Sequence, residues 1–92
     1  MLMSQAAIER LLQERFHPTY LQVTDDSAKH AGHVGAKQGG HYKVVIVSAD
    51  FEGKSLLERH RMVYAALEPL KTVIHALAIQ AKKTGTHWLF KR

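Results

Sequence analysis

A run of four β-branched residues, Val44 to Val47, is the strongest indication of secondary structure in this chain. The segment around it, residues 41–48, predicts a β-strand with largely apolar side chains on both faces. Such a strand is buried only when other elements cover both sides of its sheet. The run is far shorter than the roughly 20 apolar residues that span a bilayer. Because residues 1–4 also lack the basic start and apolar stretch of a signal peptide, we expect a cytoplasmic protein without membrane contact.

A helix with a recognisable start follows this strand. Ser55 and Glu58 have the spacing of a capping box, in which each side chain accepts a hydrogen bond from the other residue's backbone N–H. The helix is expected to run to about Glu68, where Pro69 ends it. Its predicted buried stripe consists of Leu56, His60, Val63 and Leu67, widened by Leu57 and Tyr64.

Three further segments complete the predicted fold. Residues 4–16 form a helix that Ser4 caps and Pro18 stops, and residues 20–24 and 74–79 form strands. The glycine-rich segment 25–40 is predicted as a long loop. The element order is α-β-β-α-β, and the helix between the last two strands is a crossover. If those strands are parallel neighbours, an α/β (α+β) fold results, with a three-stranded sheet that carries both helices on one face.

The composition is that of one small globular domain. The chain has 92 residues, of which 46% are hydrophobic and 23% charged, and this fits a single domain over residues 1–92. Its core is expected at about residues 4–80, and the basic residues 81–92 are expected to form a flexible tail. The net charge of +5 permits contact with nucleic acid. The basic residues are spread along the chain, however, so most are expected to form a solvated surface.

The sequence contains no constellation typical of an enzyme. We find no nucleophile elbow, no ordered Ser–His–Asp set and no phosphate-binding glycine loop, so we expect a non-enzymatic protein. The absence of cysteine also excludes a disulfide or a nucleophilic thiol from this chain. Residues 32–35 match the Gly-x-x-Gly of KH domains, but there the motif joins two helices, whereas here it lies between two predicted strands.

The sequence contains seven histidines and no cysteine, so any metal ligands from this chain would be imidazoles or carboxylates. His30 and His33 are three residues apart in the glycine-rich loop, a weak chelating spacing that is more typical of a polar linker. His60 is predicted to be a core histidine satisfied by a hydrogen bond. His75 begins the third strand, where a structural role and a metal-binding role fit the pattern equally well. No ligand role is predicted for the other three, which are His17 at a helix end, His41 at a strand entry and His87 in the tail.

Several short motifs at fixed spacing together resemble the BolA family. They are Asp26-Ser27 with His30, Gly39-Gly40-His41-Tyr42-Lys43-Val44, Val47-Ser48 with Phe51-x-Gly53, Arg59-His60-Arg61-x-Val63-Tyr64 and Ile74-His75-Ala76-Leu77. The match covers about residues 5–80 and is specific as an ensemble. It implies a fold like a class II KH domain, which agrees with the element order derived above. The tail lacks the proline of the family's Thr-Pro-x-x-Trp pattern, so the final helix often seen there is not expected.

The resemblance also implies a partner and a cofactor. BolA-like proteins bind monothiol glutaredoxins and share a 2Fe–2S cluster with them, in iron–sulfur cluster trafficking or in iron and redox regulation. Mapped onto this sequence, the ligands are His30 and His75, with His33 as the alternative loop ligand. Two histidines can replace two thiolates on one iron. The other two ligands would be a glutaredoxin cysteine and glutathione, so this chain alone, a monomer or weak homodimer, would hold no cluster.

A second function is implied by the same resemblance. BolA-like proteins are also described as DNA-binding transcriptional regulators linked to cell morphology and stress. The corresponding surface is residues 51–64, with Lys54, Arg59 and Arg61 as the expected phosphate contacts.

Overall fold

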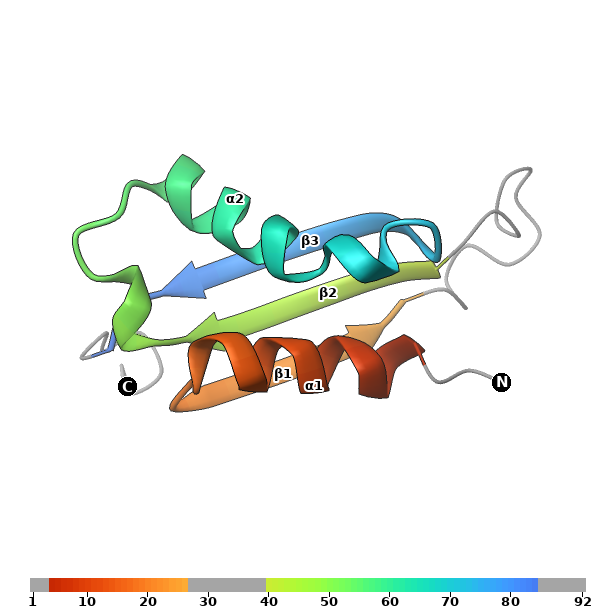
Figure 1. Cartoon of the computed structure of the whole chain (residues 1–92), viewed down its shortest axis with the longest axis horizontal. Helices are drawn as coiled ribbons and strands as arrows, with labels where there is room; N and C mark the ends of the chain where they lie inside the picture. Colours follow the sequence, from red (N-terminus) through yellow and green to blue (C-terminus); the bar gives the residue numbers. More distant parts are fainter. Residues whose placement is uncertain (1–3, 27–39, 85–92) are drawn as a thin grey trace.

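The computed structural model describes residues 4–26 and 40–84. Within them lie two α-helices and three strands (Figure 1): α1 (Ser4–Phe16), β1 (Tyr20–Asp25), β2 (Gly40–Val47), α2 (Leu56–Ala66) and β3 (Ile74–Lys82). Two short 3₁₀ helices, η2 (Ala49–Phe51) and η3 (Glu68–Leu70), flank α2 in sequence. The predicted α-β-β-α-β order is confirmed, and β3 is longer than the predicted 74–79. The predicted loop falls mostly outside the described residues.

The three strands form one mixed sheet in the order β1-β2-β3. β1 pairs with β2 antiparallel, and β2 pairs with β3 parallel, so β2 is the central strand. α1 and α2 lie on the same face of this sheet (Figure 1). Buried residues of both helices share one core with β2, as Ile8, Leu12, Val63, Val44 and Ile46 show. The three-stranded sheet with both helices on one face is therefore confirmed.

The central strand is buried on both sides over most of its length. Val44 and Ile46 face the helices and are fully buried, and Val45 and Val47 on the opposite face are 7% and 6% exposed. Lys43 also points to that opposite face and is exposed. This burial is what the apolar run predicts.

Ser48 connects three elements just beyond the end of β2. Its buried hydroxyl donates a hydrogen bond to the carbonyl of Phe16, at 2.9 Å, where α1 ends. The same oxygen accepts a hydrogen bond from the N–H of Asp50, at 3.1 Å, and so caps η2. The Phe16 and Phe51 rings pack against each other with their centroids 5.0 Å apart. The end of α1, the end of β2 and the approach to α2 are thereby held together.

The predicted capping box of α2 is present, with Ser55 and Glu58 bonding each other's backbone N–H groups. The buried stripe, in contrast, is only partly correct. Val63 and Leu67 are buried, but Leu56, Leu57 and Tyr64 are exposed by 62%, 59% and 52% of their surfaces. The core-facing side of α2 is instead formed by Val63 and Leu67 with the partly buried Met62 and Ala66, so Leu56, Leu57 and Tyr64 lie outside it. No helix within residues 4–26 and 40–84 is long and apolar enough to cross a membrane.

His60 also differs from its prediction. It is half-buried, and its Nε2 atom is buried without a hydrogen-bond partner among the described residues. The expectation was a core histidine satisfied by a hydrogen bond, whereas His60 is only half-buried and its Nε2 makes no such bond within the described residues. His60 lies near the exposed Leu56 end of the predicted stripe. The backbone N–H and C=O groups around it already bond one another within the helix, so they offer no partner to Nε2.

Candidate functional site

His75 occupies an irregular position at the start of β3. Gly40 of β2 pairs with Ile74, but the next residue, His41, pairs with Ala76, so β3 carries one extra residue opposite this step. That extra residue is His75, and its side chain is exposed. A β-bulge of this kind re-aims the side chain that it leaves unpaired.

The imidazole of His41 lies beside that of His75. The two ring centroids are 5.1 Å apart, and the ring planes are tilted by 52°. His41 is half-buried, and its carbonyl accepts a 2.7 Å hydrogen bond from the N–H of Asp26 at the end of β1. A shallow depression next to this pair is lined by Asp26, His41, Ala76 and Ala78, among others. The two histidines therefore meet at the end of the sheet where the parallel strands β2 and β3 both begin.

The predicted loop ligands cannot be placed beside this pair. His30 and His33 lie outside the described residues, so their assignment stays a prediction. Among the described residues, no group of three histidine, aspartate or glutamate side chains is arranged to hold a metal ion. The sheet thus supplies two imidazoles from this chain, and a metal here would take its other ligands from elsewhere.

The three residues of the predicted basic surface on α2 differ in exposure and in bonding. Arg59 is half-buried and donates two hydrogen bonds to backbone carbonyls: Nε to Lys54, at 3.1 Å, and one terminal nitrogen to Ala81, at 3.1 Å. Lys54 and Arg61 are exposed. The backbone hydrogen bond from Ser55, together with the nearby Lys54 and Arg61, holds the pKa of Glu58 below its ordinary value. Lys54 and Arg61 are therefore better placed than Arg59 to meet a phosphate.

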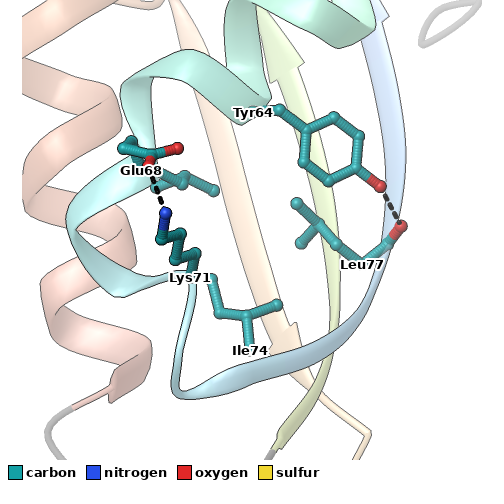
Figure 2. Close-up of a pocket in the computed structure, with 6 residues that line it drawn as sticks. Tyr64, Glu68, Lys71, Ile74 and Leu77 are labelled. Atoms are coloured by element: carbon teal, nitrogen blue, oxygen red, sulfur yellow. Dashed lines mark hydrogen bonds and ion pairs between the residues drawn. The ribbon is translucent and has the colours of Figure 1, made fainter.

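A second concave feature lies between the end of α2 and β3. Figure 2 shows this groove, of about 140 Å³, lined by Tyr64, Leu67, Glu68, Lys71, Ile74 and Leu77. The Tyr64 hydroxyl donates to the carbonyl of Leu77 at 3.4 Å, and Lys71 pairs with Glu68 at 2.8 Å. The hydrogen bond that Lys71 donates to the Glu68 carboxylate raises the pKa of Lys71. The groove is mainly apolar, and its polar side chains are engaged in the two interactions just described.

Sequence reasoning missed the pairing of His41 with His75. A usable signal was present, because each histidine stands at the beginning of a predicted strand. The beginnings of parallel strands that neighbour each other lie at the same end of a sheet. The bulge that brings His75 opposite His41 has no such signal, since it depends on the register of two segments more than 30 residues apart in sequence.

Comparison with known proteins gives a consistent result. The family model described as BolA-like protein matches residues 12–85. "DNA-binding transcriptional regulator BolA" of Escherichia coli (strain K12) is 44% identical over 79 residues, which cover 85% of this chain and 73% of that protein. Human BolA-like protein 1 is 45% identical over 85 residues, and the match spans 91% of this chain but only 60% of the human protein.

A solved structure gives the same assignment. The BolA domain of SufE1 from Arabidopsis thaliana superposes with a TM-score of 0.78 at 40% identity, covering 91% of this chain and 95% of that domain. The fold-level expectation of an α+β domain like those of the BolA family is thereby confirmed. By sequence and by structure, this chain belongs to the BolA-like protein family.

Proposed function

We propose that this chain is a non-enzymatic, cytoplasmic partner of a monothiol glutaredoxin that shares a 2Fe–2S cluster with it. It would act in iron–sulfur cluster trafficking or in iron and redox regulation. The observation that carries the proposal is the exposed imidazole of His75, which a bulge sets at the end of the sheet beside a second imidazole. Family membership supports it, because the motif that contains His75 lies within the matched residues.

The donor set of this chain fits such a cluster. Two histidines can replace two thiolates on one iron of a two-iron cluster. The chain has seven histidines and no cysteine, so it offers imidazoles only. His75 and one loop histidine, His30 or His33, would bind one iron. A glutaredoxin cysteine and glutathione would supply the sulfur ligands, and this chain would hold no cluster by itself.

The test is anaerobic co-purification with a monothiol glutaredoxin, followed by iron and sulfide analysis and visible circular dichroism. A stable complex with a cluster signal that differs from that of holo-glutaredoxin alone is expected. His75→Ala should remove this difference. His17→Asn is the matched control, because His17 is exposed at the far end of α1 and asparagine tolerates its positive φ of 46°. A spectrum unchanged by His75→Ala, or no complex at all, would overturn the proposal.

DNA binding is the second candidate. It is favoured by the described function of the E. coli relative and by the exposure of Lys54 and Arg61 at the start of α2. Fluorescence anisotropy with duplex DNA over a salt series is the test. If Arg61 contacts a phosphate, Arg61→Ala should lower the log–log salt slope by about 0.9. An unchanged slope in both Lys54→Ala and Arg61→Ala would show that this surface does not bind DNA.

A further inference from the structure

The outer edge of β3 is the starting point. In the sheet order β1-β2-β3, β3 has β2 on one side, and no strand of the described residues pairs with its other side. The N–H of Ser48 donates to the carbonyl of Lys82, and alternate residues of a parallel strand bond the same neighbour. The backbone N–H and C=O groups of Leu77, Ile79 and Ala81 therefore point away from β2.

Two side chains of α2 already bond this edge. The Tyr64 hydroxyl donates to the carbonyl of Leu77 at 3.4 Å (Figure 2), and a terminal nitrogen of Arg59 donates to the carbonyl of Ala81 at 3.1 Å. Both carbonyls thus face the outer edge. The Tyr64 bond is exposed and longer than is usual for a hydroxyl donor, so the N–H of an added strand could replace it at little cost.

The other edge of the sheet is less open. The side-chain amide of Gln5, in α1, donates a partly buried 2.8 Å hydrogen bond to the carbonyl of Val23 in β1. β1 also has six residues, whereas β3 has nine. A further strand would therefore find more backbone to pair with along β3.

α2 lies along β3 (Figure 1) and presents an apolar surface beside the outer edge. Leu57 and Tyr64 are seven residues apart, so they lie on the same side of the helix, and they are 59% and 52% exposed. The groove between α2 and β3 continues this surface with Leu67, Ile74 and Leu77. A strand added at the edge would bury these apolar side chains.

The surroundings of the edge are basic. Residues 54–83 contain six lysines and arginines and two glutamates, so an acidic occupant is favoured. Arg61 is exposed and lies four residues from Leu57 and three from Tyr64, so its charge adjoins the apolar surface. A second copy of this chain would bring the same basic edge, and residues 85–92 contain no carboxylate side chain. Neither of them matches the charge of this edge.

We propose that the outer edge of β3 binds an extended, acidic segment of a partner protein as a fourth, antiparallel strand. Its backbone pairs with the three outward-facing residues of β3. Its apolar side chains, at alternate positions, cover Leu57 and Tyr64, and its carboxylates lie near Arg61. In this mode of recognition main-chain hydrogen bonds provide affinity and alternate side chains provide specificity. The proposal is independent of the glutaredoxin complex, because it uses none of the histidines.

The test uses the full chain and a synthetic peptide, as long as β3, in which valine and glutamate alternate. Fluorescence anisotropy of the labelled peptide measures binding, and NMR follows amide hydrogen exchange in β3. With the peptide at about 100 times its Kd, exchange at Leu77, Ile79 and Ala81 should slow by up to about 100-fold. The amides of Ala78 and Gln80, which already pair with β2, should change little. Only strand pairing produces this alternation.

Three variants test the side-chain contacts. Leu57→Ala should weaken binding about tenfold, because it removes apolar surface that the peptide buries. Arg61→Glu should weaken binding more at low salt than at high salt, because contacts between exposed charges are screened. Arg10→Glu is the matched control and should bind as the parent does. It makes the same charge change on an exposed residue of α1, beside Leu21 of β1.

Modified peptides separate charge from backbone pairing. Directly opposed residues of an antiparallel pair share one face, so the valines, which face α2, also donate their N–H groups to β3. A peptide N-methylated at its valines should not bind, whereas one N-methylated at its glutamates should bind. Equal binding of the two would refute strand pairing. Equal binding of a peptide with lysine in place of glutamate would refute the acidic partner.

The free chain gives a further way for the inference to fail. If the amides of Leu77, Ile79 and Ala81 are already protected in the absence of peptide, the edge is occupied and the inference is wrong. The occupant would be a second copy if the chain is dimeric, and residues 85–92 if it is monomeric. Peptide binding without alternation along β3 would equally overturn the inference.

Discussion

A terminal nitrogen of Arg59 donates a hydrogen bond to the carbonyl of Ala81, 3.1 Å away, and so ties the first turn of α2 to the edge strand β3. Ala81 is 2% exposed, so this carbonyl lies in a largely buried setting. An arginine that sequence reasoning placed on a phosphate-binding surface thus has a structural role in the fold.

The first prediction follows from this bond. Arg59→Ala should lower the free energy of unfolding by about 1–3 kcal/mol, because it leaves a buried acceptor without its donor. Arg61→Ala, on the exposed side of the same turn, should change it by less than about 0.5 kcal/mol. Urea denaturation of both variants measures the difference. Equal stabilities would show that the Arg59 bonds contribute nothing.

The second prediction concerns the stability of the fold at acid pH. Hydrogen bonds from Ser55 hold the pKa of Glu58 below its ordinary value of 4.5. The ionised carboxylate therefore stabilises the fold above about pH 4.5, and this contribution is lost as the pH falls through the lowered pKa of the folded state. Glu58→Gln should lower the Tm at pH 7 and flatten its decline between pH 5 and pH 3. A parallel decline in both proteins would contradict the capping role.

The third prediction tests a turn. Gly53 has a φ of +72°, and a Cβ added there would meet nothing within 4 Å. The cost of Gly53→Ala is therefore purely conformational, and we expect about 1 kcal/mol of destabilisation in thermal unfolding. Gly53→Asn should cost less, because asparagine visits this region more readily. An alanine variant as stable as the parent would mean that the turn relaxes.

The fourth prediction separates the two sides of α2. Val63→Ala should cost about 2 kcal/mol, because Val63 is fully buried and leaves a cavity. Leu57→Ala should cost less than about 0.5 kcal/mol, because 59% of Leu57 is already exposed. Chemical denaturation of the two variants is the measurement. A large loss of stability in Leu57→Ala would contradict this difference and would support the wider buried stripe predicted from the sequence.

These contrasts show what local sequence patterns determine here. The Ser55–Glu58 capping box and the strand around Val44 depend on residues close in sequence, so pattern reading located both. The exposure of Tyr64 depends on the width of the sheet beneath α2. The spacing of apolar residues along a helix does not reveal that width. The pairing of His41 with His75 needs both the parallel arrangement and a one-residue shift in register. The position of His75 at the same end of the sheet as His41 was thus predictable, whereas the contact between the two rings was not.

The shift in register makes His75 dispensable for the architecture. If His75 were deleted, Ile74 would be followed directly by Ala76, and the side chains would again alternate between the helix side and the open side of the sheet. Leu77, Ile79 and Ala81 would keep their partners in β2, so a chain one residue shorter should fold at least as well. The deletion variant would then be a matched scaffold that differs from the parent in a single imidazole, with the core left intact.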